Sequence, residues 1–429
     1  MRSRLCYAAL WALAFPVLLF YLLYRSMAQS GYRKSLSERF ARYDKTPLNP
    51  IWLHAASLGE VNAAAPLLVE LRRDYPDAPL MISCQTPAGR QAALALTINN
   101  CTCLYLPFDV RVLTQKFVAR IQPRMALIFE TEIWPNLFLS IKQAGVPLLM
   151  INARITERSV RRYAKLTGIF ANALALADQI ACQSDADAAR FIEAGAKPES
   201  ISVFGNIKWD KAPDEACLKL AETLKSSWLQ QPIWMAASTH PDEESMVLAA
   251  HREVLANWPN ALLLWAPRHP ERFQPACDLA LALGFSISKR SVQGKPDKSS
   301  QVFVIDSLGE LLPFMACADV VFVGGSLQNI GGHNVLEPAM LGIPILVGPY
   351  TQNFVEIVRV LEKSGALIEV PDGYRLHSEL LSLLDDLPQA RERGRKGLHM
   401  VQQNRGALQK TKALVAQRLF SSNCKIQNY

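Results

Sequence analysis

From residue 50 onward, short apolar runs alternate with longer segments in which apolar residues recur at helical spacing. Such alternation is typical of a parallel β-sheet covered by helices, because each crossover between parallel strands passes through a helix. The predicted strands of the first half are Ile51–Ala55, Leu80–Gln85, Cys103–Leu106, Met125–Glu130, Leu148–Asn152, Ile180–Gln183 and Ser202–Gly205. Those of the second half are Trp234–Ser238, Leu262–Ala266, Phe285–Ser288, Val302–Ile305, Val320–Val323, Ile345–Val347 and Leu367–Val370.

The alternation stops between Trp209 and Gln231, where the chain becomes polar and helical, and then restarts. This interruption predicts two α/β units, each a Rossmann-like, doubly wound parallel sheet, with a cleft between them. A chain of 429 residues is also too long for a single hydrophobic core. We expect the first unit at 29–207, a linker at 208–231, and the second unit with C-terminal helices at 232–429.

Residues 1–28 carry a different pattern. No charged residue occurs from Leu5 to Tyr24, and this apolar length matches the hydrocarbon core of a bilayer. The basic flank after the segment, beginning at Arg25, is stronger than the flank before it. The positive-inside rule therefore predicts a single-pass anchor in the inner membrane, with the rest of the chain in the cytoplasm. The alternative is a cleaved signal peptide with Ser26–Ala28 as its cleavage site, but its apolar core would be long.

Aromatic and apolar residues recur at helical spacing just after this segment, with basic residues at the positions between them. The pattern predicts a short basic amphipathic helix on an anionic membrane surface, or an ordinary surface helix packed on the first unit. The apolar positions are Tyr32, Leu36, Phe40 and Tyr43, and the basic ones are Arg33, Lys34, Arg39 and Arg42.

Composition narrows the function classes. A net charge of +8 favours acidic partners such as phosphates, nucleotides or anionic lipid. The nine cysteines contain no Cys-x-x-Cys pair, which indicates reduced thiols in a cytosolic setting. Neither unit carries Gly-x-Gly-x-x-Gly after its first strand, and no P-loop motif occurs. A nicotinamide or flavin dinucleotide is therefore not expected.

Three acidic residues follow strands of the first unit. Glu60, in His54-Ala-Ala-Ser-Leu-Gly-Glu60, lies where the first strand turns into a helix, and a carboxylate in such a crevice can act as a general base. The alternative is an acidic first-turn residue that stabilises the helix dipole. Glu130 and Glu132 follow the fourth strand, and Glu130 is the better placed for the crevice.

Lys208 follows the last strand of the first unit, at the proposed boundary. It could reach a phosphate or a sugar carboxylate, or it is a solvated linker lysine. Asp185 and Asp187 form an Asp-x-Asp pair, but Ser184 before them and Ala188 after them are typical of a helix N-terminus. We therefore predict no metal site there.

Polar and glycine residues also follow four strands of the second unit. The longest such segment runs from Gly324 to Pro338, where two Gly-Gly pairs permit close backbone approach and a helix start near Asn334 offers free amides for a phosphate or ribose. Glu337 lies one turn further and can accept ribose hydroxyls, or it pairs with an N-cap Asn334. Arg268, after Pro267, can bind a phosphate with both arms of its guanidinium. The other two segments are Ala237–His240 and Asp306–Leu311.

In this order, these motifs resemble those of the bacterial 3-deoxy-D-manno-oct-2-ulosonic acid (Kdo) transferases. The resemblance extends from the N-terminal apolar segment nearly to the C-terminus. It rests on His54–Glu60, Glu130–Asn136, Asn152–Arg154, Gly205–Asp210, Ser238–His240, Pro267–Phe273, Gly309–Glu310 and Gly324–Glu337. It implies the GT-B fold, an inverting transfer without a metal or other cofactor, CMP-Kdo as donor and a lipid A precursor as acceptor.

The resemblance also implies roles for single residues. Glu60 would deprotonate the 6′-hydroxyl of the acceptor, and Glu130 and Lys208 would stabilise the transition state. CMP would lie against Pro267, Arg268, Leu308, Gly309, Glu310, Asn334, Val335, Leu336 and Glu337. No nucleic acid is implied as a partner. Two alternatives stay open: another membrane-associated GT-B transferase with a UDP-sugar donor and a polyprenyl-linked acceptor, and an inactive tether that binds nucleotide or lipid.

Overall fold

The computed structural model describes residues 35–426, except 165–167, 214, 227 and 229–231, and scattered positions before residue 35. Half of the residues of the predicted anchor, Leu5 to Tyr24, therefore lie outside the described residues. Within the described part of the chain, no helix combines the length and apolar character that a membrane span needs.

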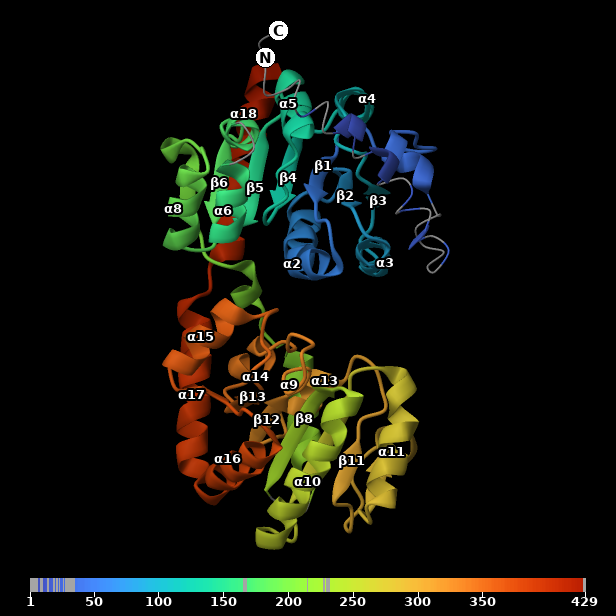
Figure 1. The fold of residues 1–429 in the computed structure, drawn as a ribbon, viewed down its shortest axis with the longest axis vertical. Coiled ribbons are helices and arrows are strands. Elements are labelled where there is room, and N and C mark those ends of the chain that lie inside the picture. The colour runs from blue at the N-terminus through green and yellow to red at the C-terminus, as the bar shows by residue number, and fades with distance from the viewer. Residues whose placement is uncertain are drawn as a thin grey trace. The chain divides into compact units, whose positions relative to one another are not determined.

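The chain forms two α/β units (Figure 1). The first comprises Met1–Asp210 together with Arg405–Tyr429, and the second comprises Lys211–Asn404. Each contains one seven-stranded sheet, ordered β3-β2-β1-β4-β5-β6-β7 in the first unit and β10-β11-β9-β8-β12-β13-β14 in the second. The strand pairs within both sheets are parallel, for example β1 with β4 and β8 with β12. The two doubly wound sheets predicted from the alternation are confirmed.

The strands of the first unit are β1 Ile51–His54, β2 Leu80–Cys84, β3 Cys101–Tyr105, β4 Met125–Phe129, β5 Leu148–Ala153, β6 Gln179–Cys182 and β7 Ile201–Val203. Its helices are η2 Leu36–Phe40, α2 Leu58–Asp74, α3 Pro87–Ala95, α4 Arg111–Ile121, α5 Pro135–Gln143, α6 Glu157–Ala164, α7 Ile169–Leu174, α8 Asp185–Glu193, η3 Pro198–Ser200, η4 Ile207–Asp210 and α18 Ala407–Ile426. Each predicted strand of this unit is present, with ends shifted by at most two residues.

Helices cover both faces of the first sheet. Successive strand residues point to opposite faces, so residues on both faces are buried. Trp52 of β1 packs against Phe117 of α4, with ring centroids 5.1 Å apart, in a core that also includes residues of α5 and α8. Its neighbours Ile51 and Leu53 pack on the other face, in a core built with α2, α3 and α18. The near-continuous apolar runs of the strands follow from this double coverage.

Helix α18 belongs to the first unit, although its position at the end of the chain placed it in the second (Figure 1, red). Its residues Leu414, Val415 and Leu419 are buried in the same core as Leu149 and Ile151 of β5. The sequential crossovers leave this part of that face open, because α2 and α3 follow β1 and β2 while the later helices cover the opposite face. The returning chain therefore buries the remaining apolar surface.

The second unit repeats the arrangement. Its strands are β8 Ile233–Thr239, β9 Leu262–Pro267, β10 Ile287–Lys289, β11 Val302–Val304, β12 Val320–Val323, β13 Ile345–Val347 and β14 Leu367–Glu369. Its helices are α9 Glu215–Ser226, α10 Pro241–Asn257, η5 Pro270–Arg272, α11 Phe273–Ala282, α12 Arg290–Gln293, α13 Leu311–Met315, α14 Leu336–Met340, α15 Val355–Lys363, α16 Gly373–Asp385 and α17 Leu387–Gln403. Buried residues of α10, α11 and α16 pack on Trp234, Trp265 and Phe322 of the sheet.

The predicted basic amphipathic helix is wrong in one respect. Only Leu36–Phe40 is helical in its described part, as the 3₁₀ helix η2, and Arg39 is buried. The Arg39 guanidinium donates to the side chain and the backbone oxygen of Gln85 and lies 4.4 Å from the centre of the Tyr105 ring. Arg39 thus joins η2 to the first unit and does not face a membrane, whereas Arg42 is exposed.

Candidate active site

Three adjacent strands of the first unit, β1, β4 and β5, bring the acidic and basic candidates to one edge of the sheet. Glu130 directly follows β4, and Arg154 directly follows β5. Glu60 lies in the first turn of α2, after β1. Because parallel strands end at a common edge, residues distant in sequence gather there.

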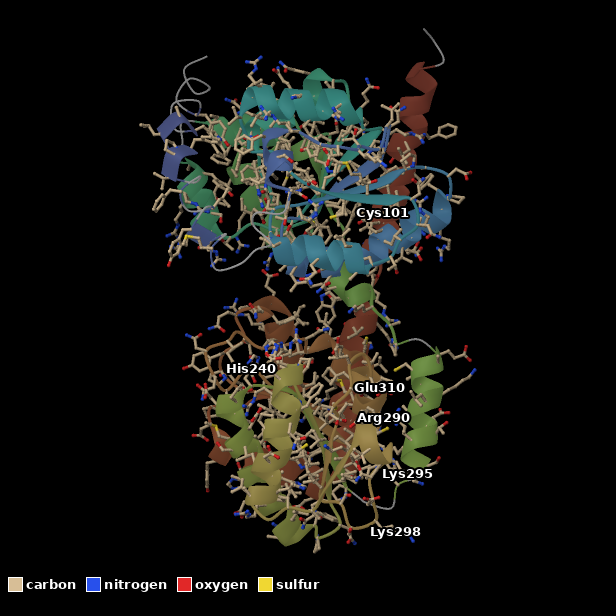
Figure 2. All side chains as sticks on the ribbon, turned by 90° about the vertical axis from the view of Figure 1, so that its right-hand side faces the viewer. Cys101, His240, Arg290, Lys295, Lys298 and Glu310 are labelled. Carbon is tan, nitrogen blue, oxygen red and sulfur yellow. The ribbon has the colours of Figure 1, made fainter. Side chains whose placement is uncertain are left out.

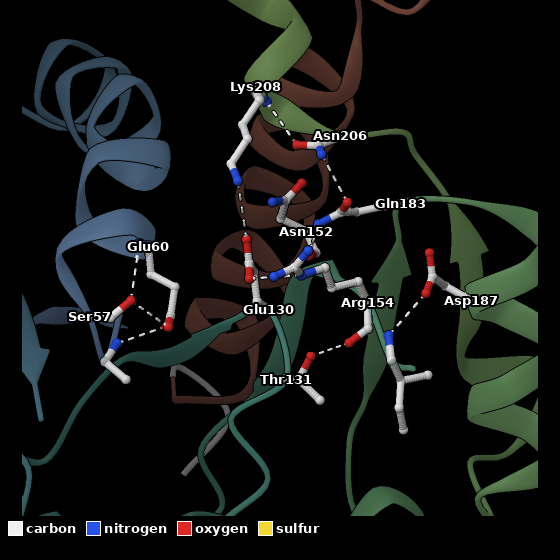
Figure 3. Close-up of polar contacts among 12 residues, drawn as sticks. Ser57, Glu60, Glu130, Thr131, Asn152, Arg154, Gln183, Asp187, Asn206 and Lys208 are labelled. Carbon is white, nitrogen blue, oxygen red and sulfur yellow. Dashed lines mark hydrogen bonds and ion pairs between the residues drawn. The ribbon is translucent and has the colours of Figure 1, made fainter. Parts of the chain in front are cut away.

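Glu130 stands between two cations (Figure 3). Its Oε2 accepts a hydrogen bond from Nε of Arg154 at 3.1 Å, and its Oε1 lies 3.9 Å from Nζ of Lys208. Glu130 is 8% exposed. The two cations therefore hold this nearly buried carboxylate in place. The structure thus pairs Glu130 with Lys208, and Arg154 adds a cation to which the sequence assigned no role.

The backbone of Glu130 has a positive φ of 56°, in the left-handed region that side chains with a Cβ rarely adopt. Its amide still donates to the oxygen of Ile151 at 3.0 Å, so the strand pairing holds the residue in this conformation. Strained backbone of this kind concentrates at functional sites. The turn directs the chain out of the sheet where the carboxylate meets Arg154 and Lys208.

A hydrogen-bond network positions Lys208. The Asn152 Oδ1 accepts from the amide of Ile207 at 3.0 Å, and the Asn206 Oδ1 accepts from the amide of Lys208 at 3.0 Å. The Asn206 side chain also donates to the Gln183 Oε1 at 2.9 Å. Ile207 and Trp209 are buried on either side of Lys208. The lysine therefore belongs to the short helix η4 within the first unit and is not a linker residue.

Glu60 closes the N-terminus of α2 and lies apart from the Glu130 cluster in the close-up (Figure 3). One oxygen accepts from the amide of Ala56 at 2.8 Å, and the other accepts from the Ser57 hydroxyl at 2.9 Å. Ser57, the N-cap of α2, in turn accepts from the Glu60 amide, so the two side chains cap the helix together. The first-turn interpretation of Glu60 is thus correct for its geometry, and it leaves the chemical one open.

The electrostatic surroundings of Glu60 make its carboxylate more basic than an ordinary one. Burial, followed by the charge of Glu132, raises the pKa of Glu60, although the bonds from Ala56 and Ser57 oppose this. The Glu132 carboxylate accepts a hydrogen bond from the Trp134 indole N–H at 2.8 Å, and it lies 3.7 Å from the His54 Nε2. These partners lower the pKa of Glu132 against the effect of its burial, so it stays charged beside Glu60. A carboxyl with a raised pKa accepts a proton more readily than an ordinary one.

His54 and Glu132 are site residues that sequence reasoning missed. His54 is the last residue of β1 and is fully buried, with its Nδ1 bonded to Ser83. Glu132 follows Glu130 by two residues, and the sequence favoured Glu130 alone. The available signal was the polar residue His54 at the end of an otherwise apolar strand.

Arg268 and Pro267 lie at the corresponding edge of the second unit, where β9 ends. The Arg268 amide donates to the oxygen of Thr239, at the end of the adjacent β8, and its side chain is exposed. The guanidinium is therefore accessible at the strand ends, as predicted.

The segment from Asn334 to Glu337 forms a closed local turn. The Asn334 amide group donates to Glu337 at 3.0 Å, and its oxygen accepts from the amide of Leu336. Val335 and Leu336 are buried, at 1% and 3% exposure, so only their backbone could meet a ligand. The alternative pair of Asn334 with Glu337 is therefore seen in the structure, but the N-cap of α14 is Val335, and this helix is only one turn and a half long.

Leu308, Gly309 and Glu310 lie in the turn before α13. Leu308 is largely exposed, and Gly309 has a φ of 84°. Glu310 accepts from both Nε and Nη2 of Arg290, at 3.0 and 2.7 Å. The bond from Arg290 lowers the pKa of Glu310. Figure 2 shows Glu310 and Arg290 within the second unit, with Lys295 and Lys298 further along it.

The Asp185 pair has the predicted helix-start geometry. Ser184 is the N-cap of α8, and Asp187 accepts from the Ile155 amide at 2.9 Å. In the part of the chain that the structure describes, His, Cys, Asp and Glu side chains form no group of three suited to a metal ion.

The sequence was compared with known proteins. A family model described as 3-deoxy-D-manno-octulosonic-acid transferase (kdotransferase) matches residues 34–211. The 3-deoxy-D-manno-octulosonic acid transferase of Haemophilus influenzae is 36% identical over 412 residues, which are 95% of this chain and 96% of that protein. The enzyme of the same name from Bordetella pertussis is 35% identical over 78% of this chain and 79% of its own length.

Solved structures share the fold at low sequence identity. The UDP-GlcNAc 2-epimerase of Neisseria meningitidis, solved with UDP-GlcNAc bound, aligns with 88% of this chain and 100% of its own. The TM-score is 0.52 at 14% identity, so the likeness concerns the GT-B type of fold alone.

The electrostatic effect of Glu132 on Glu60 gives a testable prediction. We expect Glu132→Gln to lower the pKa of Glu60, because the substitution removes a negative charge that disfavours the Glu60 carboxylate. Carboxyl ¹³C NMR titration of the Glu-labelled protein would measure this, with the Glu60 signal assigned by its loss in Glu60→Gln. The exposed Glu157→Gln of the same unit is the control and should leave the titration unchanged. An unchanged Glu60 pKa in Glu132→Gln would contradict the coupling.

Proposed function

The chain belongs to the 3-deoxy-D-manno-octulosonic acid (Kdo) transferase family, and we propose that Glu60 is the base with which it glycosylates a lipid A precursor. It is a glycosyltransferase that transfers Kdo in lipopolysaccharide assembly. The proposed donor is CMP-Kdo, the proposed acceptor group is the 6′-hydroxyl of the precursor, and the proposed transfer inverts the anomeric centre without a metal ion.

The observation that supports this proposal best is the environment of Glu60. Its carboxylate lies at the strand-end edge of the first unit, with a pKa raised by burial and by Glu132. A sugar hydroxyl is a weak nucleophile, and a base of raised pKa removes its proton as the new bond forms. Inverting transfer requires one such base, on the face of the sugar opposite the leaving group.

The proposed step is a single displacement. The acceptor oxygen gives its proton to Glu60 and bonds to the anomeric carbon of Kdo, while the bond from that carbon to the phosphate oxygen breaks. CMP leaves with the electron pair of that bond. No general acid is required, since a phosphate is already a weakly basic leaving group.

Glu130 and Lys208 are proposed to stabilise the transition state. The anomeric carbon gains positive charge as the phosphate departs, and the Glu130 carboxylate can balance it electrostatically. Lys208 and Arg154, which contact Glu130 at 3.9 and 3.1 Å, supply positive charge for the sugar carboxylate or the phosphate. Their mutual ion pairs hold all three side chains in place before substrate binds.

The second unit is proposed to bind the donor. Arg268 would bind the phosphate, and Glu337 with Asn334 would bind the ribose. The turn at Leu308–Glu310 offers exposed backbone, because Gly309 has open space around it. The remaining residues proposed for the CMP site are Pro267, Val335 and Leu336, through their backbone.

Substitution of Glu60 tests the proposed base. We expect Glu60→Gln to lower the transfer rate by about 10²–10⁴, the usual contribution of a general base. Gln is preferred to Ala because its amide oxygen can still accept a bond from Ala56 or Ser57 and so retain the helix cap. Mass spectrometry of the lipid after incubation with CMP-Kdo and tetraacylated lipid A precursor measures the transfer.

The matched control is Glu253→Gln, an exposed helical residue of the second unit, which should transfer at the parental rate. Circular dichroism and CMP binding should be the same in both variants as in the parental protein. Transfer by Glu60→Gln at the parental rate would remove Glu60 as the base.

The alternative donor, a UDP-sugar, makes an opposite prediction. If CMP-Kdo is the donor, free CMP should inhibit transfer and compete for the nucleotide site at concentrations where UDP does not. Calorimetric titration of the full chain with CMP and with UDP measures the two affinities directly. Tighter binding of UDP than of CMP would favour the alternative.

We further propose that the N-terminal segment holds the enzyme at the cytoplasmic face of the inner membrane. Described side chains of this segment fall on two faces. Trp11 and Phe15 contact Phe108 of the first unit, with ring centroids 6.3 and 5.5 Å apart. Leu13, Val17 and Phe20 recur at i, i+4 and i+7 and are 79%, 70% and 73% exposed. An exposed apolar stripe beside an amphiphilic substrate suits the acyl region of a bilayer.

The triple variant Leu13→Gln, Val17→Gln, Phe20→Gln tests this membrane contact. We expect less protein to sediment with anionic vesicles, and activity on acceptor in vesicles to fall more than activity on detergent-dispersed acceptor. Leu48→Gln with Val112→Gln removes two other exposed apolar residues of the first unit and serves as control. Equal losses of activity in both assays would contradict the membrane role.

A further inference from the structure

Three histidines gather at the strand-end edge of the second unit, and the proposed mechanism uses none of them. His240 follows β8, His269 follows β9, and His333 lies in the loop after β12. These three strands are neighbours, in the order β9-β8-β12. The edge is the one at which Arg268 is exposed, and Figure 2 labels His240 there, away from Lys295 and Lys298.

His240 and His333 are joined by a direct contact. Their Nε2 atoms are 3.0 Å apart, and the ring planes are within 5° of parallel. This distance requires a hydrogen bond, so one ring donates its Nε2–H and the other accepts. The His269 ring meets His240 edge-on, with centroids 5.4 Å apart. Three imidazoles thus share one small region of the edge.

Glycines make room for this pair. Gly325 has a φ of 67°, and a Cβ there would lie 2.9 Å from Cδ2 and Nε2 of the His333 ring. A side chain at Gly324 would meet the backbone oxygen of Ser238 at 2.7 Å. The first Gly-Gly pair therefore accommodates the His333 ring and the close backbone of β8.

The amides of the same loop already bind a carboxylate of the protein. Glu243 of α10 is fully buried and accepts from the amides of Gly325, Ser326 and Leu327 at 2.7, 2.9 and 2.8 Å. It also accepts from the amide of His240 at 3.1 Å. The sequence predicted a close backbone approach of a ligand at these glycines, but an internal anion occupies the loop amides. An external anion must use other donors of this edge.

Burial and the nearby positive charges disfavour protonation of the pair. Burial lowers the pKa of His333 to about 4, and Arg268, His240 and His269 act in the same direction. Burial also lowers the pKa of His240, with His269 and Arg268 acting with it and Glu243 and Glu244 against it. Both of these carboxylates have other partners, since Glu243 binds the loop amides and Glu244 pairs with Arg272. A bound anion would add a negative charge beside the pair, which would raise the pKa values of these histidines and favour protonation of the pair.

We propose that His240 and His333 together bind the phosphate of the nucleotide donor beside Arg268, and that the pair takes up a proton as the phosphate binds. This inference rests on the proposed donor being a nucleoside monophosphate derivative held by the second unit. The neutral pair uses one Nε2–H between its own rings. The added proton supplies a further N–H and a positive charge for the phosphate oxygens.

Calorimetry of the full chain with CMP and with cytidine separates binding of the phosphate from binding of the nucleoside. Titrations near pH 7 in buffers of different ionisation enthalpy give the number of protons taken up. The parental protein should take up a proton on binding CMP but not on binding cytidine. In His240→Gln/His333→Gln, the affinity for CMP should fall about 10-fold to 100-fold, as expected for lost hydrogen bonds to a charged group. The affinity for cytidine should stay unchanged and the proton uptake on binding CMP should disappear.

His399→Gln is the matched control, because it removes an exposed histidine of α17 in the same unit. It should retain the parental CMP affinity and proton uptake. The single variant His333→Gln carries the test if the double variant fails to fold, since Gln can replace the bond to His240.

Parental CMP affinity and proton uptake in the variants would overturn the proposal. An equal loss of CMP and cytidine affinity would overturn it too, because the pair would then only shape the loop. Failure of the proposed donor has a different signature: the parental protein would bind UDP in preference to CMP. The histidine variants would then be titrated with UDP and uridine, and loss of affinity for UDP alone would still support the phosphate site.

Discussion

The parallel direction of every strand pair is the constraint on which the remainder of this structure depends. Parallel strands need a crossover after each strand, and the crossovers cover both faces of the sheet with helices. All strands of one sheet then end at one edge, where the chain leaves the apolar core. Residues as distant as Glu60, Glu130 and Lys208 gather at that edge of the first unit. The same constraint leaves part of one face uncovered, and α18 fills it from the far end of the chain.

The acidic residues at the first-unit edge differ in their partners, and the partners determine their chemistry. Glu130 forms ion pairs with two cations, Arg154 and Lys208. Glu132 has the Trp134 N–H and His54, and its charge acts on its neighbour. Glu60 has only neutral donors from the helix start, so burial and Glu132 raise its pKa. One residue type thus has three different electrostatic environments at this edge, and those of Glu60 and Glu132 move their pKa values in opposite directions.

In the second unit, a carboxylate of the protein itself occupies the donors of the glycine-rich loop. A glycine-rich loop offers several amides, which commonly bind phosphate, yet Glu243 satisfies them from within the protein. The internal carboxylate fixes the loop and fixes the His333 ring against His240. Arg268 and the paired histidines are left as accessible donors of this edge. The loop glycines therefore shape this edge of the sheet, and the side chains that gather there come from neighbouring strands.

The sequence by itself determined the two sheets, their strands to within two residues, and the presence of Glu60, Glu130 and Arg268 at strand ends. Apolar runs and helical spacing are local signals, and a parallel sheet converts them directly into positions along one edge. The order of the motifs along the chain resembles that of the Kdo transferases, and this resemblance predicted the family. Local patterns also predicted the pair of Asn334 with Glu337 and the start of α8 after Ser184, since these involve residues within one turn of helix.

Only the tertiary structure decided which of these residues act on one another. The ion pairs of Glu130 and the influence of Glu132 on Glu60 join separate strands, and no spacing along the chain encodes them. Arg39 looked like a surface cation because its sequence neighbours are basic, but Gln85 and Tyr105 bury it. Helix α18 looked like part of the second unit because of its position in the chain, but its apolar face matches the open face of the first. Burial and pairing depend on surfaces that form only when distant segments meet, so they follow from the fold and not from local sequence.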